Sequence, residues 1–368
     1  MKIPFIDLKR QYQQRKAEID QAIHEVLDES NFLGGAKVKS FEDRFAEQCG
    51  TKHCVGVANG TDALYTTLKI LGIGKGDEVI TSACSWISTS GTISQTGAKP
   101  VFVDIGEDYL IDVKQIESNI NSKTKAIIPV HLYGQMANMK AIAKVAEKYN
   151  LMIIEDSAQA HLAEREGLFV GEVSKAATFS FYPSKNLGAY GDAGAIVTNC
   201  EQLAEKCRQF ANQGQLVRHQ HKLEGINSRL DTIQAAILSV KLKYLSEWTA
   251  QRRKIAKQYN EALKGVSGLR LPIVNSNSNP VYHLYVVSAE NREGLQNYLK
   301  SNEISTAIHY PTPLPFLDCY QDLNHKVEDF PVAHAESSKI LSLPIFPEMT
   351  TKEVDYVCES VRHFYDSH

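Results

Sequence analysis

The sequence lacks the long apolar segments that carry a chain into or through a membrane. No stretch of about 18 apolar residues occurs in its 368 residues, and charged side chains interrupt the N-terminal segment where an export signal would be apolar. Charged residues make up 23% and the formal net charge is only -3, which excludes both a strongly basic nucleic-acid surface and an acidic disordered tail. We therefore expect a cytoplasmic protein with no nucleic-acid partner and no membrane partner.

Patterns typical of disulfide frameworks, metal centres and nucleotide loops are also missing. The seven cysteines are odd in number and widely spread, and they form neither a C-x-x-C pair nor a cluster with closely spaced histidines. The sequence contains no H-E-x-x-H motif and no Walker G-x-x-x-x-G-K-[ST] motif. We therefore expect reduced thiols and no metal site.

Short β-rich runs alternate with amphipathic helical stretches between residues 52 and 199. The helical stretches lie at 62–71, 87–96, 137–149 and 201–212. The seven strand candidates are CVGVA, EVITS, KPVFVD, AIIPVHL, LMIIEDS, ATFSF and GAIVT. This alternation favours an α/β fold, with a mostly parallel seven-stranded sheet covered by helices on both faces.

The pattern changes after a long helical region at about 231–264, which is expected to break near Ser246. We place a domain boundary close to Glu247, between a large domain at 1–247 and a smaller α+β domain at 248–368. The N-terminal segment is expected to pack on the small domain. The elements expected in the small domain are HLYVVSA, a helix through GLQNYLKSN, ISTAIHY and a closing helix from Thr351.

Ligands of open α/β sheets bind at the carboxyl ends of the strands, and the first strand candidate ends in a phosphate-binding pattern. The strand breaks at Gly60 and a helix begins, so free N–H groups and the hydroxyl of Thr61 would face an anion. Taken alone, the same residues also fit an ordinary turn with a helix cap.

The strand through Ile154 delivers Asp156 to the same edge of the sheet. A carboxylate in a partly buried cleft needs a partner, and a protonated pyridine nitrogen is a suitable one, because the carboxylate keeps the ring cationic and able to accept electrons. Gln159 lies three residues further on, where it would donate a hydrogen bond to an oxygen of that ring. Helix capping is the simpler interpretation of this segment in isolation.

A single lysine, Lys185, follows the strand through Phe179 among aromatic and small residues. Most lysines are solvated, so its context has to argue for another role. An amine attacks an aldehyde only after losing its proton, and desolvation beside a cationic ring favours that loss. Lys185 would then form a Schiff base with the aldehyde of a cofactor that contains this pyridine ring. It would also act as the general acid and base that moves a proton at the substrate carbon.

Four segments together resemble the DegT/DnrJ/StrS family of nucleotide-sugar aminotransferases, and the match spans nearly the whole chain. The order and spacing of these segments make the resemblance specific. It implies a fold type I, aspartate-aminotransferase-like enzyme that uses pyridoxal 5'-phosphate, with a nucleotide-linked keto-sugar as acceptor and glutamate as donor. The segments are NGTDAL, EDSAQAH, SFYPSKNLGAYGDAGAIVTN and GINSRLDTIQAAIL.

The resemblance also assigns the cofactor-binding residues. Gly60, Thr61 and Ser180 would hold the phosphate, and Trp86 would stack on the ring where the family usually has tyrosine or phenylalanine. Asn227 would reach the phosphate of the neighbouring subunit's cofactor. A homodimer with shared active sites is therefore implied.

Substrate contacts follow from the same resemblance. Arg229 would approach the neighbouring subunit's substrate, although without the family it fits a surface or capping role equally well. His309 and Tyr310 would hydrogen-bond the sugar or its diphosphate. Leu33 and Gly34 match a region that lines the nucleotide pocket, and the segment after Pro313 lacks a histidine common in the family.

The AIHYPTPL segment resembles members that act at C3 of the hexose more than those that act at C4. Two acceptors stay open, a dTDP-linked 3-keto-6-deoxyhexose and a UDP-linked 3-keto-hexuronic acid, and both are precursors of surface polysaccharides such as lipopolysaccharide O-antigen. A 4-keto-6-deoxy sugar nucleotide is the alternative within the family.

Three further classes compete with this interpretation. A nicotinamide-dependent oxidoreductase would need G-x-G-x-x-G straight after an early strand, whereas Gly72, Gly74 and Gly76 follow a helical stretch. A sugar dehydratase branch has histidine in place of the lysine, so Lys185 argues against it. A non-catalytic regulatory or binding protein with this fold is the third alternative.

Overall fold

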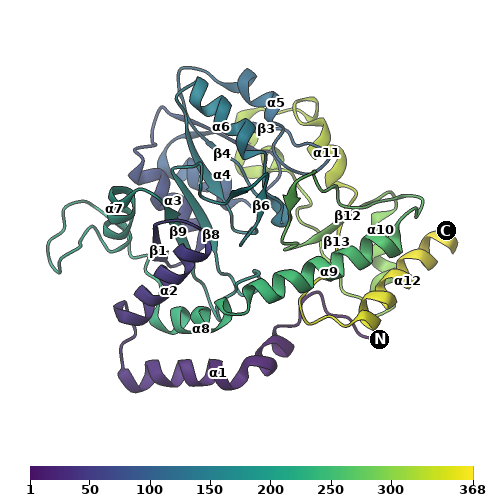
Figure 1. The fold of residues 1–368 in the computed structure, drawn as a ribbon. Helices are drawn as coiled ribbons and strands as arrows, with labels where there is room; N and C mark the ends of the chain where they lie inside the picture. The colour runs from purple at the N-terminus through teal and green to yellow at the C-terminus, as the bar shows by residue number, and fades with distance from the viewer. Residues whose placement is uncertain (368) are drawn as a thin grey trace.

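A seven-stranded sheet forms the centre of the fold, which a computed structural model describes for residues 1–367 (Figure 1). The strand order is β1-β9-β8-β5-β4-β2-β3, and β9 alone runs antiparallel to its neighbours. The fold class predicted from the sequence is therefore confirmed. The strands are β1 (His53–Val57), β2 (Glu78–Ser82), β3 (Lys99–Val103), β4 (Thr124–Ile128), β5 (Met152–Asp156), β8 (Ala176–Ser180) and β9 (Gly194–Thr198).

Helices cover both faces of this sheet because its buried strands are apolar on both sides. Ile127 and Ile153 pack toward one face, whereas their neighbours Ile128 and Ile154 pack toward the other. The first face is covered by α2 (Gly35–Gln48), α6 (Met139–Lys148) and α8 (Thr232–Leu242). The second face is covered by α3 (Gly60–Ile70), α4 (Ser88–Thr96) and α7 (Glu201–Ala211).

A smaller unit at the C-terminal side contains a three-stranded sheet in the order β10-β12-β13. Ile3 is buried in its hydrophobic cluster, so the N-terminal segment lies against this unit. The segment ISTAIHY lies outside the strands and makes two isolated bridges, Ile304 to Ile3 and Ala307 to Ser342. The elements are β10 (Leu269–Arg270), β12 (Tyr285–Ala289), α10 (Arg292–Ser301), α11 (Pro331–Ser337), β13 (Ile340–Leu343) and α12 (Thr351–Ser367).

One long helix, α9 (Leu245–Leu263), connects the two units. The break between α8 and α9 falls at Lys243 and Tyr244, slightly before the expected position. The boundary proposed at Glu247 therefore lies within the first turn of α9. Figure 1 shows α9 running from the end of α8 toward α12, with both chain termini on the side of the small unit.

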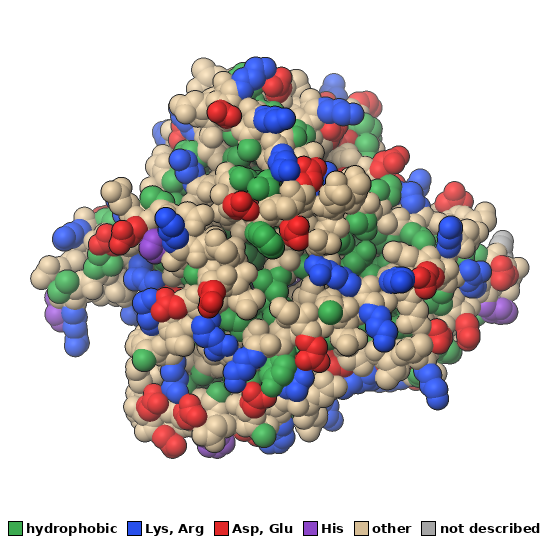
Figure 2. Space-filling model, viewed as in Figure 1, with side chains coloured by type: hydrophobic (Ala, Val, Ile, Leu, Met, Phe, Trp, Pro, Cys, Tyr) green, Lys and Arg blue, Asp and Glu red, His purple; other side chains and the backbone are tan. Residues whose placement is uncertain are grey.

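The remaining elements are peripheral. Helix α1 (Leu8–Glu29) packs along α8 through Ile19, and its surface is polar. None of the helices in residues 1–367 combines the length and the apolar character that a membrane span requires. On the face shown in Figure 2, positive and negative side chains are interspersed. The other elements are α5 (Val113–Ile116), β6 (Glu164–Arg165), β7 (Leu168–Phe169), β11 (Ser278–Asn279) and the 3-10 turns Glu117–Asn119, Leu132–Gly134, Leu314–Phe316, Asp318–Leu323 and Val327–Asp329.

Candidate active site

The first part of the site is a cradle at the N-terminus of α3. Asn59 caps the helix by accepting from Asp62 N at 2.8 Å, and the N–H groups of Gly60 and Thr61 have no acceptor within the helix. A Cβ on Gly60 would lie 2.7 Å from Ser180 Cβ, and a Cβ on Gly194 would lie 2.4 Å from Asn59 O. Only glycines allow this close approach, which places Ser180 beside the free N–H groups.

The cradle suits a phosphate group. A helix N-terminus offers N–H donors and a partial positive charge to an anion, and hydroxyls add further donors. Thr61 Oγ1 lies 2.7 Å from Ser88 Oγ at the start of α4, so two hydroxyls meet at the same place. The structure thus brings Gly60, Thr61 and Ser180 together, and their binding of a phosphate stays a prediction.

Asp156 ends β5 and its side chain is 6% exposed. Thr89 Oγ1 donates to Asp156 Oδ2 at 2.7 Å, and Ala158 N donates to Asp156 Oδ1 at 3.2 Å. These bonds orient the carboxylate. A protonated pyridine nitrogen fits this carboxylate, because it would supply the opposite charge that a buried anion needs.

Lys185 lies in the segment 181–193 between β8 and β9, here called the lysine loop. Its backbone N–H donates to Tyr182 O at 2.8 Å, which forms a turn around the lysine. The side chain is partly buried, and burial lowers the pKa of Lys185 to about 8, although the charge of Asp156 acts in the opposite direction. An appreciable fraction of the amine is therefore uncharged near neutral pH, as a nucleophile requires.

Neutral histidines surround this amine. Burial, followed by the charge of Lys185, lowers the pKa of His161 to about 3 and that of His309 to about 4. The same two causes lower the pKa of His283 well below its ordinary value. These imidazoles therefore carry no charge at neutral pH, and His309 acts there as a hydrogen-bonding group rather than as a cation.

Gln159 joins the large unit to the segment at His309. Its Oε1 accepts from Tyr133 N at 2.7 Å, and its Nε2 donates to the hydroxyl oxygen of Tyr310, Oη, at 3.1 Å. Tyr133 in turn donates its hydroxyl to His309 O. The contact from Gln159 to a ring oxygen stays a prediction, and the structure shows that its amide is held at both ends.

Aromatic side chains line the mouth of the site. Trp86 is 57% exposed, and its ring lies 5.6 Å from that of Tyr310. His309 stacks on Phe5 at 5.7 Å, and its Nδ1 lies 2.8 Å from Ser342 Oγ. An indole with an open face beside Tyr310 can stack on a planar ring.

The remaining predicted residues form a second group. Leu33, Asn227 and Arg229 line a cavity of about 520 Å³ that they share with Ala58 and Gly191, from the chain just before the cradle and from the lysine loop. Arg229 Nη1 donates to Asn212 Oδ1 at 3.3 Å, while its Nε is buried with no hydrogen-bond partner in the described part of the chain. Gly34, the N-cap residue of α2, lines an adjoining cavity of about 300 Å³ together with Leu33 and Arg229.

Sequence reasoning missed Ser88, Thr89 and Tyr133. A signal existed for the first two, because SWISTSGT is rich in hydroxyls and follows the strand EVITS at the same edge of the sheet. No local pattern marked Tyr133, because its contacts are a backbone N–H that donates to Gln159 and a hydroxyl that donates to His309 O. Among residues 1–367 no cluster of histidine, cysteine, aspartate or glutamate could hold a metal ion.

The chain is similar to known proteins over nearly its whole length. The model of the DegT/DnrJ/EryC1/StrS aminotransferase family matches residues 13–362. A crystal structure of Streptomyces venezuelae DesV in complex with a ketimine intermediate is similar, with a TM-score of 0.98 at 40% identity over 100% of this chain and 99% of that one.

Three curated relatives cover nearly the whole chain. A "pleiotropic regulatory protein" of Geobacillus stearothermophilus is 45% identical and covers 99% of both chains. A dTDP-3-amino-3,6-dideoxy-alpha-D-galactopyranose transaminase of Aneurinibacillus thermoaerophilus is 45% identical, covering 98% of this chain and 99% of its own. A UDP-2-acetamido-2-deoxy-3-oxo-D-glucuronate aminotransferase of Pseudomonas aeruginosa is 43% identical with the same coverage.

Proposed function

The chain belongs to the DegT/DnrJ/EryC1/StrS aminotransferase family, and we propose that it moves an amino group from glutamate to the C3 ketone of a nucleotide-linked sugar. It is an aminotransferase whose cofactor is pyridoxal 5'-phosphate. The observation that carries the proposal is Lys185, an amine with a lowered pKa at the same sheet edge as Asp156 and the phosphate cradle.

The residues of the chain have distinct tasks in this reaction. Pyridoxal phosphate, when bound, supplies an aldehyde carbon that takes up the amino group and a ring that accepts electrons. Asp156 holds the ring nitrogen protonated, and the cradle at Gly60 and Thr61 binds the phosphate. Lys185 Nζ takes a proton from the donor's α-carbon, and in the second half of the reaction it returns a proton to the sugar carbon.

Two similarities support a 3-keto acceptor. One relative is named for a dTDP-3-amino sugar and another for a UDP-3-oxo-glucuronate, so both act at the third carbon of their sugars. His309 and Tyr310 stand at the mouth of the site, where a neutral imidazole and a hydroxyl can hydrogen-bond sugar hydroxyls. Arg229 offers a cation for a uronate carboxylate or a diphosphate.

The acceptor is tested by supplying the purified protein with glutamate and one of three sugars: a dTDP-linked 3-keto-6-deoxyhexose, a UDP-linked 3-keto-hexuronate, or a dTDP-linked 4-keto-6-deoxyhexose. We expect amination of a 3-keto sugar with kcat/KM at least about 100-fold above that of the 4-keto sugar, because a misplaced ketone loses alignment with Lys185. Mass spectrometry detects the product and NMR locates the new amine. Preferred amination of the 4-keto sugar would refute the C3 assignment and leave the family assignment intact.

A homodimer with shared sites is part of the proposal. The cavity lined by Asn227 and Arg229 opens beside Ala58 and Gly191, and a buried Arg229 Nε lacks an acceptor among residues 1–367. We propose that a second subunit places its cofactor phosphate and substrate next to these residues. The protein would act in the cytoplasm, on precursors of surface polysaccharides.

Subunit mixing tests this arrangement. Lys185→Ala and Arg229→Ala subunits are each expected to be nearly inactive, but a random mixture should regain about one quarter of the unaltered activity, because half of the dimers are mixed and each has one intact site. Activity is measured after unfolding and refolding the two variants together. A mixture no more active than its two components would show that both residues serve one subunit's own site.

A regulatory role is the second candidate, because a 45% identical relative carries a regulatory name. The site argues for catalysis: Lys185, Asp156 and the glycines of the cradle are all present with workable geometry. A purely regulatory protein would need neither a reactive lysine nor the carboxylate and phosphate cradle that accompany it. Turnover of glutamate by the purified protein distinguishes the two.

A further inference from the structure

Helix α8 presents two polar side chains to the lysine loop, and the reaction described above uses neither. Gln234 and Lys241 stand seven positions apart, so they lie on the same face of the helix, two turns from each other. Gln234 Oε1 accepts from Tyr190 N at 2.8 Å, and its Nε2 donates to Tyr190 O at 3.2 Å. One side chain thereby holds both backbone groups of a residue in the lysine loop.

Lys241 is a buried lysine whose amine contacts the lysine loop. Its side chain is 1% exposed, its Nζ donates to Gly188 O, and the same nitrogen lies 5.1 Å from the centre of the Tyr190 ring. Burial lowers the pKa of Lys241 to about 8, although the charge of Glu348 acts in the opposite direction. Lysines are rarely buried, and hydrocarbon side chains would pack here at less cost, so the contact with Gly188 needs an explanation.

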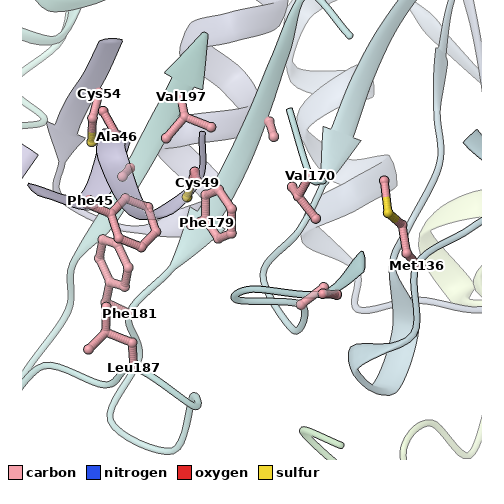
Figure 3. Packing of buried hydrophobic residues seen from close by; sticks show 14 of the residues in the cluster. Phe45, Ala46, Cys49, Cys54, Met136, Val170, Phe179, Phe181, Leu187 and Val197 are labelled. Carbon is pink, nitrogen blue, oxygen red and sulfur yellow. The ribbon is translucent and has the colours of Figure 1, made fainter. Parts of the chain in front are cut away.

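The lysine loop is too tightly packed for Gly188 to move alone. A Cβ on Gly188 would lie 2.2 Å from Pro183 O, so these two backbones touch. Ala189 N donates to Phe181 O at 2.7 Å and closes the loop on itself. Figure 3 shows Leu187 in line with Phe181 and Phe45, and Leu187 is fully buried.

A displacement at one end of the loop therefore reaches its centre. Lys185 lies between Pro183 and Leu187, and its own N–H is bonded to Tyr182 O. On the far side, Asn186 Nδ2 donates to Val281 O at 3.0 Å. The loop is thus held at Asn186 by the segment that precedes β12, and at Gly188 and Tyr190 by α8.

We propose that Gln234 and Lys241 are positioning residues that fix residues 188–190 and so keep the Lys185 amine at the edge of the sheet opposite Asp156. This inference rests on the proposed function, because it assigns the two residues to the placement of the Schiff-base lysine. Both side chains act through the backbone of the lysine loop. Gln234 also lines the cavity that contains Asn227 and Arg229, whereas Lys241 does not, so Lys241 provides the cleaner test.

The test compares Lys241→Met with Lys243→Met. Methionine keeps the length and much of the volume of the buried side chain but donates no hydrogen bond. Lys243 lies next to the end of the same helix, is 50% exposed and pairs with Glu18 at 3.2 Å, so its substitution controls for the loss of a lysine from this region. We expect Lys241→Met to lower kcat of the glutamate half-reaction by about 10- to 100-fold, with KM changed by less than about threefold. Lys243→Met should stay within about twofold of the unaltered protein.

A second measurement needs no turnover. Cofactor-free protein is treated with acetic anhydride at a series of pH values, and the labelling of the peptide that contains Lys185 is followed by mass spectrometry. In the unaltered protein, labelling should be half-maximal near pH 8. In Lys241→Met we expect the midpoint to rise toward the ordinary lysine value of about 10.4, because a loosened loop exposes the amine to water.

The outcomes separate the two proposals. If borohydride fails to trap pyridoxal phosphate on Lys185 in the unaltered protein, the proposed function itself is wrong. If trapping succeeds and folded Lys241→Met has the same kcat and labelling midpoint as Lys243→Met, the positioning role is wrong, even if the melting temperature falls. If Lys241→Met does not fold, Gln234→Leu, which removes both bonds to Tyr190, decides by the same criteria.

Discussion

Replacing Lys185 with alanine is expected to lower kcat by about 10,000-fold and to leave a folded protein that no longer holds its cofactor covalently. The variant loses the amine that anchors the cofactor and the group that moves the proton at the substrate carbon. Added pyridoxal phosphate should still bind, because the cradle at Gly60 and Thr61 and the carboxylate of Asp156 are unchanged. Steady-state turnover and borohydride trapping measure the two effects.

Lys175→Ala is the matched control. Lys175 precedes the same strand, β8, and its side chain is exposed, so its removal should change kcat by less than about twofold. Borohydride should trap the cofactor on the peptide that contains Lys185 in this control. Recovery of the label at any other lysine would refute the assignment of Lys185.

Replacing Asp156 with asparagine is expected to lower kcat by about 100- to 1,000-fold. Asparagine can still accept a hydrogen bond from Thr89, so the geometry is largely retained, but the negative charge that keeps the ring nitrogen protonated is lost. Removing one partner of a buried ion pair costs about 3–5 kcal/mol. The lower part of this range, about 3–4 kcal/mol, corresponds to a loss of about 150- to 1,000-fold in rate. Stopped-flow measurement of the glutamate half-reaction provides the rate.

Thr89→Val separates charge from geometry at the same site. It removes the bond at 2.7 Å to Asp156 and keeps the carboxylate, so a loss of only about 10-fold is expected. An Asp156→Asn protein that retained more than a tenth of its kcat would contradict the role given to the charge.

The sheet could be predicted because its strands are buried on both faces. In runs such as MIIED and GAIVT the apolar residues are consecutive rather than placed at helical spacing. Gly60 and Gly194 mark positions where the backbone closely approaches another segment. The candidate residues at the strand ends followed from this topology, since parallel strands deliver their carboxyl ends to one edge. The polar residues that hydrogen-bond to these candidates, such as Thr89, did not follow from the topology.

Other elements escaped prediction for physical reasons. Helix α1 buries little more than Ile19 and Val26 along its length, so its apolar spacing is weak. The strand Ile340–Leu343 is a short apolar run that a helix would fit equally well. Contacts such as Gln159 to Tyr310 join residues 151 positions apart, and no local pattern reports them.

The position of β9 between β1 and β8 has a consequence for the order in which the site is assembled. Within the described residues β1 pairs with β9 alone, so the strand that precedes the phosphate cradle joins the sheet only when β9 inserts between it and β8. A ribosome-bound chain that ends before Gly194 would already contain Lys185 and Asp156, but β1, the strand that leads into the phosphate cradle, would have no strand to pair with. We therefore expect the growing polypeptide to acquire cofactor affinity late, when its last central strand closes the gap.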